Sequence, residues 1–351
     1  MEKSLVELSA CLLRAASLGV AAAIFAASGI SAQSVASQYP EKPIKIIVPF
    51  APGGSTDVLA RVIGQKLTES WGQPVIVDTR PGGSTIIGTG LAAKADPDGY
   101  TLIIVVSNLV TNPALHATMP YDAIKDFEPI SFLGRAPIVI YTNPTFPPNN
   151  VKELVALAIA KPGTLNFGSA GPASMTHLTA ELLKLQQGLD MTHVVYRGGA
   201  PALNDLLAGQ IPMTFATVIQ ALSQYQAGLV RALGVAASER HKSIPNVPTF
   251  REQGFDILVM EWYGLLAPAG TPKPIIAKLS AEMRRILALP EVAERLAAIE
   301  MLGSSPRRTR HVLHSRRNRS LDPDYQETGD QARLSGGPIG VRRRSSGSAT
   351  I

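Results

Sequence analysis

Two glycine-rich segments carry the residues best suited to binding an anion. The first, residues 53–57 with the sequence GGSTD, follows the apolar run Ile44–Val48 and precedes a helical pattern. The second, residues 168–177 with the sequence GSAGPASMTH, also lies between a strand pattern and a helical pattern. A helix N-terminus offers unpaired N–H groups and the positive end of the helix dipole. Both segments are therefore candidate anion sites, although the same residues also suit an ordinary helix cap.

The first segment does not match the common nucleotide-binding motifs. It lacks the Gly-Lys-Ser/Thr ending of a P-loop and the G-x-G-x-x-G spacing of a dinucleotide site. Pro81–Thr85 repeats its centre. Glycines that permit a close backbone approach, followed by two hydroxyls and an acid that can cap the helix, fit a smaller anion better than a nucleotide.

The second segment raises the question of catalysis. Gly168 is directly adjacent to Ser169, so the segment is not a G-x-S-x-G nucleophile elbow. A hydrolase that pairs Ser169 with His177 remains the enzymatic alternative. His177 and Glu181 are four residues apart on a helix, which suits a structural pair better than a metal site, because no further His or Cys stands at ligand spacing. We therefore expect no catalytic residue, no metal and no cofactor.

A third loop, Tyr196–Gly199, follows another strand pattern and leads into a helix that carries Asp205. Asp205 can orient a loop by hydrogen bonding, although an exposed carboxylate is the default for a single Asp. Arg197 can pair with an anion or face solvent.

The elements that position these loops alternate short apolar runs with amphipathic stretches, which is typical of βα units. Strands are predicted at 44–48, 75–77, 100–106, 138–141, 164–167, 193–195, 212–215, 230–235 and 259–266. Helices are predicted at 57–71, 90–95, 151–160, 174–187, 200–208 and 274–287. Segments 143–150 and 261–264 are candidate crossings between two lobes, which would place a ligand in the cleft between them.

The N-terminus and the charge distribution limit the class of protein to which this chain can belong. Lys3 and Arg14 precede the apolar run Leu18–Ala27, and Ile30-Ser-Ala32 supplies small residues, so residues 1–32 are predicted to be an export signal. A membrane anchor is the alternative, but the run is shorter than the roughly 20 residues that span a bilayer. The single cysteine, Cys11, lies inside this segment. The net charge of +6 resides entirely in residues 306–351, so the neutral body gives no reason to expect a nucleic acid partner.

The motifs together resemble the extracytoplasmic solute-binding receptors of tripartite tricarboxylate transporters, the Bug family. The resemblance covers roughly Tyr39 to Gly303. The motifs that carry it, in chain order, are PIKIIVPF from Pro43, PGGSTD ending at Asp57, RPGG from Arg80, DPDGYTL from Asp96, GSAG from Gly168, YRG from Tyr196, DLLAG from Asp205, VPTF from Val247, WYG from Trp262 and APAGTP from Ala267.

This resemblance implies an α/β, two-lobed clamshell like that of periplasmic binding proteins, with a mainly parallel sheet in each lobe and the ligand in the cleft. It implies a periplasmic receptor, acting as a monomer, that delivers a small carboxylate to two integral membrane permease subunits and performs no catalysis. Lobe 1 would comprise residues 39–142 and 263–305, and lobe 2 residues 143–262. The ligand could be a di- or tricarboxylate, an amino acid or an aromatic acid, and Ser107, Asn108, Asn112 and Trp262 would shape the pocket. A carboxylate sensor for a membrane signalling protein is a further alternative.

By motif position, the resemblance also implies a set of ligand-binding residues. They are Phe50, Ala51, Gly53, Gly54, Ser55, Thr56 and Asp57 from the first loop, Ser169, Ala170, Gly171, Ser174 and His177 from the second, and Tyr196, Gly198 and Asp205 as supporting residues.

The sequence departs from the family pattern after Ser305, where a basic segment that begins at Pro306 replaces the family's closing amphipathic helix. With suitable synonymous codons for Arg307–Ala332, the frame displaced by one nucleotide reads EEHATFFTAEEIARWTPIIKKLGIK, which resembles the family's ending. We therefore hypothesise that residues 306–351 are a frameshift product. The alternative is a genuine basic tail that contacts RNA, acidic lipid or a partner.

Overall fold

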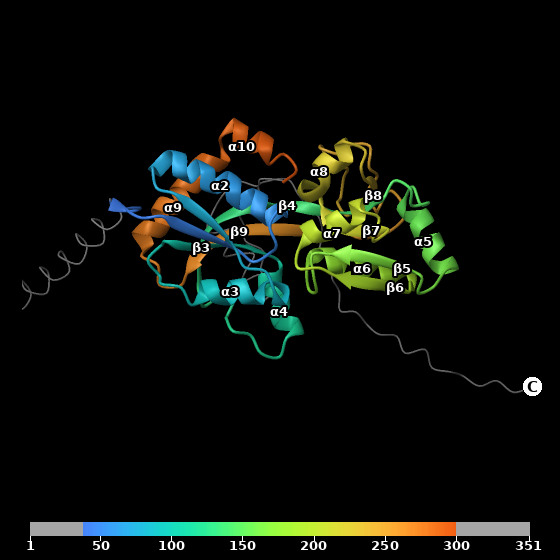
Figure 1. Ribbon diagram of the computed structural model, residues 1–351, viewed down its shortest axis with the longest axis horizontal. Coiled ribbons are helices and arrows are strands. Elements are labelled where there is room, and N and C mark those ends of the chain that lie inside the picture. The colour runs from blue at the N-terminus through green and yellow to red at the C-terminus, as the bar shows by residue number, and fades with distance from the viewer. Residues whose placement is uncertain (1–37, 300–351) are drawn as a thin grey trace, which may run out of the picture. The chain divides into compact units, whose positions relative to one another are not determined.

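The computed structural model describes residues 38–299, and the predicted signal segment and the basic tail lie outside the described residues. Within residues 38–299, helices and strands alternate along most of the chain (Figure 1). No helix in this part of the chain is both long and apolar enough to cross a membrane.

Nine strands form one continuous mixed sheet within the described range. The strand order is β2-β1-β3-β9-β4-β7-β5-β6, and β8 pairs with β4 beside this path. Pairing is parallel at both ends of the sheet and antiparallel where β4 and β9 meet their neighbours. The strands are β1 (Ile44–Val48), β2 (Val75–Thr79), β3 (Thr101–Val106), β4 (Phe127–Thr142), β5 (Leu165–Ser169), β6 (Met191–Val195), β7 (Met213–Thr217), β8 (Arg231–Val235) and β9 (Met260–Pro268).

The helices lie in the connections between these strands and after the last of them. In order they are α2 (Ser55–Trp71), the 3-10 turn η1 (Gly83–Thr85), α3 (Ile86–Ala93), α4 (Asn108–Leu115), α5 (Val151–Ala160), α6 (Met175–Gln187), α7 (Gly199–Leu207), α8 (Val218–Gln226), α9 (Lys273–Leu287) and α10 (Pro290–Arg295). The predicted strand 138–141 is only the end of β4, and α4, α8 and α10 were not predicted.

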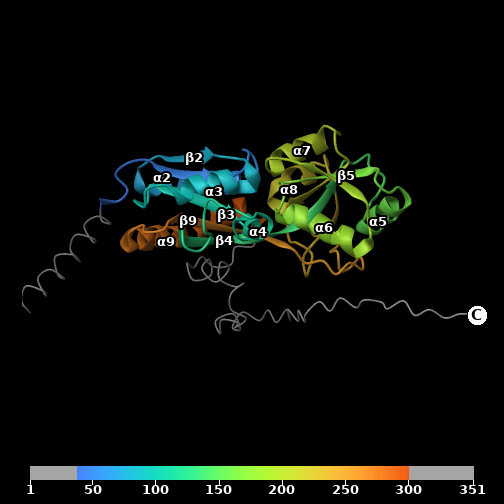
Figure 2. The ribbon, with the colours of Figure 1, turned by 90° about the horizontal axis from the view of Figure 1, so that it is seen from below.

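The sixteen-residue strand β4 links two groups of elements. Phe127–Pro137 pairs with β9, and Ile138–Thr142 pairs with β7 and β8. We call the elements around β1, β2, β3 and β9 the first lobe and those around β5 to β8 the second lobe (Figure 2). The α/β two-lobed fold class is confirmed, although one continuous mixed sheet takes the place of the mainly parallel sheet predicted for each lobe. The predicted lobe boundaries stay a prediction, and β4 changes partner between Pro137 and Ile138, before the predicted crossing at 143–150.

Each lobe has its own apolar core. In the first lobe, α2 and α9 pack on the sheet around fully buried residues such as Leu59, Ile104 and Leu279. In the second, Phe167 and Phe215 contact edge to face at 5.6 Å between ring centroids, among residues from α5 and α6. Because each lobe buries its own side chains, each can hold its loops in place independently of the other.

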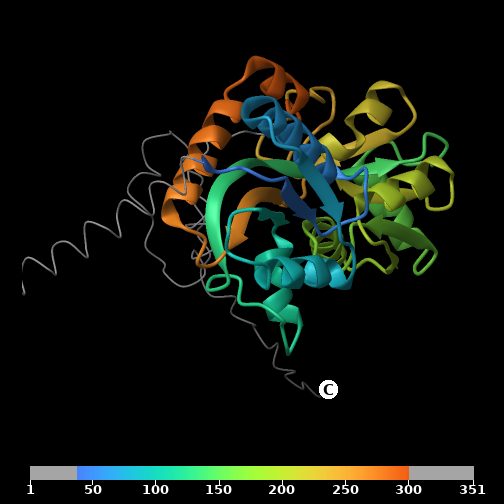
Figure 3. The same cartoon turned by 60° about the vertical axis from the view of Figure 1, so that its left-hand side comes forward.

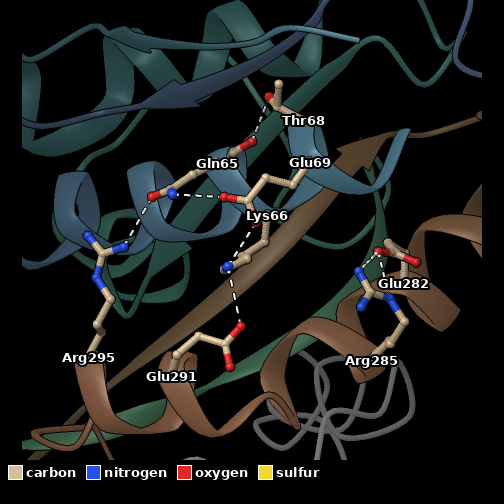
Figure 4. A network of polar contacts seen from close by, with 9 residues as sticks. Gln65, Lys66, Thr68, Glu69, Glu282, Arg285, Glu291 and Arg295 are labelled. Carbon is tan, nitrogen blue, oxygen red and sulfur yellow. Dashed lines mark hydrogen bonds and ion pairs between the residues drawn. The ribbon is translucent and has the colours of Figure 1, made fainter. Parts of the chain in front are cut away.

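The outer faces of α2 and α10 are joined by polar contacts, and α9 carries a separate contact between its own Glu282 and Arg285 (Figure 4). Lys66 of α2 contacts Glu69 at 2.8 Å and Glu291 of α10 at 3.3 Å, and Arg295 donates to Gln65 at 3.1 Å. Beneath them, Val292 and Leu296 are fully buried in the first-lobe core. The short helix α10 is therefore fixed by apolar contacts below and polar contacts above.

Candidate ligand-binding site

A small pocket of about 30 Å³ lies where loops of the two lobes meet. The first lobe supplies residues after β1, at the end of β3 and on β9, and the second supplies residues at the start of α6, α7 and α8. Its lining consists of Phe50, Gly54, Ser55, Thr56, Val106, Ala170, Thr176, Gly199, Thr217, Gln220 and Glu261.

The loop after β1 is shaped by its own backbone and by Asp57. Gly53 has a φ of 86°, in the left-handed region that favours glycine, and its N–H donates to Oδ2 of Asp57 at 2.9 Å. Arg61 donates to the same oxygen at 2.9 Å. Asp57 therefore holds the turn from inside, and α2 begins at Ser55 on the rim of the pocket.

Three helices of the second lobe also begin at the pocket. Ser174 caps α6 by accepting from the N–H of His177 at 3.2 Å, and Thr176 in its first turn lines the pocket. Gly199 begins α7, and Thr217 is the N-cap of α8. With α2, the N-termini of four helices therefore contribute residues to the lining of one small volume, and the positive ends of their dipoles favour an anion there. Among the residues that line it, no side chain is positively charged.

Two buried polar side chains near the start of α8 line this pocket. The Nε2 atom of Gln220 has no hydrogen-bond partner, and the Oγ1 atom of Thr217, which is 3 % exposed, lies beside the Tyr263 hydroxyl without a hydrogen bond of good geometry. Gln220 packs so closely on Gly199 that a Cβ there would lie 1.9 Å from its Oε1 atom, so a larger residue at this position would displace the Gln220 amide. Because buried polar groups in proteins are nearly always satisfied, these two side chains at the start of α8 indicate a place for an acceptor-rich guest.

Glu261 of β9 is the only charged side chain among the residues that line the pocket. It is 6 % exposed, and its Oε1 atom accepts from the N–H of Ser107 at 3.0 Å. Burial raises the pKa of Glu261 to about 7, although N–H groups of Ser107, Trp262 and Met175 oppose the shift. A carboxyl group in this position is poised to gain or lose a proton near neutral pH.

The segment after β5 does not contain the Ser169–His177 pair that the hydrolase alternative requires. The Oγ atom of Ser169 lies 2.7 Å from Nε2 of His193, so the histidine beside it is His193 and not the expected His177. His193 stacks on His177 with 4.2 Å between ring centroids, and His177 in turn lies 3.7 Å from Glu181. Burial and then the neighbouring His177 lower the pKa of His193 to about 4. Ser169 is fully buried and is absent from the pocket lining.

Five of the predicted ligand-binding residues line the pocket, namely Phe50, Gly54, Ser55, Thr56 and Ala170. The others shape the surrounding loops. Ala51 donates to the carbonyl of Arg197, Ser174 accepts from His177, Gly198 packs on Ala51, and Tyr196 donates to Asp205 at 2.7 Å. The carbonyl of Gly171 accepts from Ser174 at 2.6 Å. The lining residues absent from the prediction are Val106, Thr176, Gly199, Thr217, Gln220 and Glu261.

The predicted His177–Glu181 pair is present, and nothing around it resembles a metal site. Within residues 38–299, no group of three or more His, Cys, Asp or Glu side chains is placed to hold a metal ion. Lys184 shares the Glu181 carboxylate at 2.9 Å, which makes the pair part of a surface ion network on α6.

Comparison with known proteins identifies the family to which this architecture belongs. Residues 59–314 match the tripartite tricarboxylate transporter family receptor, TctC. The chain belongs to this receptor family. The TctC receptor described here is 37 % identical to the protein BugT of Bordetella pertussis over 284 residues, which cover 80 % of this chain and 87 % of BugT.

Solved structures of similar proteins have the same fold. MatC from Rhodopseudomonas palustris, with bound malate, is 32 % identical and superposes with a TM-score of 0.74 over 79 % of this chain and 97 % of MatC. An R. palustris protein solved with adipate is also 32 % identical, with a TM-score of 0.76 over 79 % of this chain and 94 % of that protein. TctC receptors are solute-binding proteins, and these two similar proteins hold dicarboxylates.

Proposed function

We propose that this receptor captures a small carboxylate in the pocket between its lobes and delivers it to a membrane permease without catalysing a reaction. The observation that carries the proposal is the convergence of four helix N-termini on a pocket whose lining contains no cationic side chain. Helix N-termini bind carboxylates through N–H groups, which makes a lysine or arginine unnecessary.

A dicarboxylate suits this arrangement because the helix termini come from both lobes. The N-terminus of α2 belongs to the first lobe, and those of α6, α7 and α8 belong to the second. One carboxylate can therefore be held by each lobe, and the ligand bridges them. The malate and adipate held by similar proteins support this ligand class.

Capture of such a ligand requires the lobes to separate. A volume of 30 Å³ has room for only about two water molecules, since each needs roughly 10–15 Å³ by this measure. A ligand with two carboxylates needs more space, so it must enter and leave a more open arrangement. Binding then shifts the population toward the closed arrangement, as in hinge-type receptors.

The proposed site of action is the periplasm, reached through the predicted export signal. The family is extracytoplasmic, which supports this location. Its transporters have membrane components, so two integral membrane subunits are the proposed partners of the closed receptor.

Thermal unfolding in the presence of carboxylates tests the proposal. A ligand that binds only the folded chain raises the transition temperature. At a ligand concentration of 100 times the dissociation constant, the free energy of unfolding increases by about 2.7 kcal/mol. We expect a rise with at least one di- or tricarboxylate and no rise with the matching dimethyl esters, which retain the carbon skeleton but not the charge. A panel without any rise, or turnover of a carboxylate ester by the purified protein, would contradict the proposal.

A further inference from the structure

We propose that Glu261 is a ligand-facing group and that the receptor takes up about one proton at this carboxyl when a dicarboxylate binds. This inference rests on the proposed function, because it concerns the same pocket. The bound state would then contain one additional proton as well as the dicarboxylate.

The position of Glu261 places two acids in one small volume. Its carboxyl group lines the pocket and is 6 % exposed. A guest carboxylate at the N-terminus of α2 or of α6 would lie beside it, since Ser55, Thr176 and Glu261 line the same 30 Å³. Two ionised carboxylates that share a buried site repel each other strongly, and such pairs retain a proton.

Most positively charged side chains on the helices around the pocket are already paired within their own helix. Helices α4 and α8 carry no charged residue. On α2, Arg61 is paired with Asp57, and on α6, His177 and Lys184 are paired with Glu181. On α7, Asp205 accepts from Tyr196. On β9 and β4, the titratable or charged side chains nearest to Glu261 in the chain and sheet register are Tyr263, Arg135 and Glu128.

Tyr263 gives a second indication that the negative charge of Glu261 acts on groups inside the pocket. Burial raises the pKa of the Tyr263 hydroxyl, and the neighbouring Glu261 raises it further. The same hydroxyl lies beside Ser55 and Thr217, both of which line the pocket. The field of Glu261 therefore extends to the position where the guest is expected.

The surroundings favour an anionic guest over a cationic one. An amino acid could pair its ammonium with an ionised Glu261 and would then need no proton. However, the pocket offers the N-termini of four helices and the buried Thr217 and Gln220 side chains, and only Glu261 offers a charged acceptor. An excess of donors selects a guest with an excess of acceptors. The sign of proton exchange distinguishes the two guests.

Calorimetry with malate and with adipate tests the inference. Each is titrated into the full chain between pH 6.5 and pH 9 in two buffers with different heats of ionisation, so that the difference gives the protons exchanged. Both dicarboxylates are fully ionised in this range. We expect uptake close to one proton at pH 8, and affinity that falls about tenfold per pH unit above pH 8.

Two variants provide matched controls. Glu261→Gln keeps the shape but cannot ionise, and it should bind with no proton uptake and with affinity independent of pH. Thr217→Ala should bind more weakly and still take up the proton. If Glu261→Gln does not fold, the wild-type titration alone decides.

The possible results separate this inference from the proposed function. Binding of either dicarboxylate without proton uptake, or with affinity that rises with pH, overturns the role of Glu261 and leaves the receptor function standing. Uptake that persists in Glu261→Gln also overturns it. If neither dicarboxylate binds, and no other carboxylate changes the unfolding temperature, the proposed function fails and the inference fails with it.

Discussion

Thr217 provides a direct test of the pocket through a single hydroxyl. Its Oγ1 atom is buried without a hydrogen bond of good geometry, and it makes no cap bond to α8. Removing it should therefore leave the free energy of unfolding nearly unchanged but weaken carboxylate binding. A hydrogen bond to a charged group contributes about 1.5–3 kcal/mol, so we expect affinity to fall roughly tenfold to a hundredfold in Thr217→Ala, measured by calorimetry. Thr217→Ser keeps the hydroxyl and should retain most of the affinity, and an equal loss in both variants would contradict this role.

His193 predicts how stability depends on pH. Its pKa in the folded chain is about 4, below the ordinary value of 6.5, so the folded state favours the neutral ring. The unfolded chain binds the proton more readily, and stability is therefore lost as pH falls from about 6.5 toward 4. We expect His193→Gln to flatten this part of the profile in urea unfolding, while the exposed His116→Gln does not.

Glu261 has the opposite effect on stability within part of the same pH range. Its pKa is raised, so its ionisation removes stability as pH rises from about 4.5 toward 7. The measured profile of the wild type contains both contributions and those of other shifted groups, such as His177, whose pKa is also lowered by burial. An unchanged slope in His193→Gln would contradict the assignment to that histidine.

The residues that line the pocket show which positions a local sequence pattern can indicate and which it cannot, while their role in ligand binding stays a prediction. Gly54, Ser55 and Thr56 were predicted from a local pattern, because a loop between strand and helix specifies its own N-terminus. Thr217 and Glu261 could not be found in this way, since they reach the pocket through the packing of distant strands. Glu261 comes from β9, which pairs with β3 and β4, more than 100 residues away in the chain.

The contacts around helix α10 allow the contributions of apolar and polar contacts to the free energy of unfolding to be compared. Leu296, the C-cap residue of α10, is fully buried in the core. Lys66 of α2 and Glu291 of α10 instead form an ion pair on the outer face (Figure 4). We expect Leu296→Ala to lower the free energy of unfolding by about 2–5 kcal/mol, the usual cost of a large-to-small change in a core. Lys66→Ala should cause a smaller change, because the carboxylates that Lys66 contacts, Glu69 and Glu291, are about half exposed to water and salt, which screen the ion pairs. Chemical denaturation measures both, and a larger loss in Lys66→Ala would reverse this interpretation.

Helices and strands were predictable where their apolar residues recur at a regular spacing. Strand β1 and helix α5 have the predicted bounds, because each is an uninterrupted run of its own period. The first half of β4 was missed, since Pro129, Gly134 and Pro137 interrupt the apolar pattern and the strand bulges at two places in its pairing with β9. Helix α8 was missed because VIQALSQYQ reads equally well as a polar connection.

The two lobes meet through backbone contacts as well as through the pocket, and this determines how the molecule can open. Figure 3 shows the long curved strand β4 in green, which pairs with strands of both lobes. The N–H of Ala51 donates to the carbonyl of Arg197 at 3.1 Å, and the hydroxyl of Thr111 donates to the carbonyl of Ala173 at 2.9 Å. These contacts join loops of one lobe to loops of the other, and they must break when the pocket opens. The strands β4 and β9 remain as the covalent connection, so they are the expected hinge.

A disulfide across this junction should therefore hold the receptor shut. A Cβ at Gly53 would lie 3.5 Å from the Cβ of Ala200 on α7, within the range of native disulfides. The only cysteine of the chain is Cys11, so Gly53→Cys with Ala200→Cys gives a defined pair once residues 1–32 are omitted. We expect the oxidised double variant to bind a carboxylate very slowly or not at all, and reduction to restore binding.

The backbone at Gly53 requires a control, because its φ of 86° strains any other residue by about 1–3 kcal/mol. Gly53→Cys alone carries this strain without the link, so only a difference between the oxidised and reduced double variant reports on opening. Binding that is equally fast in both states would mean that a ligand reaches the pocket without separation of these loops. Failure of the disulfide to form in air would mean that the loop after β1 and α7 are not adjacent in solution. Slow binding only in the oxidised state would make lobe opening the step that controls capture.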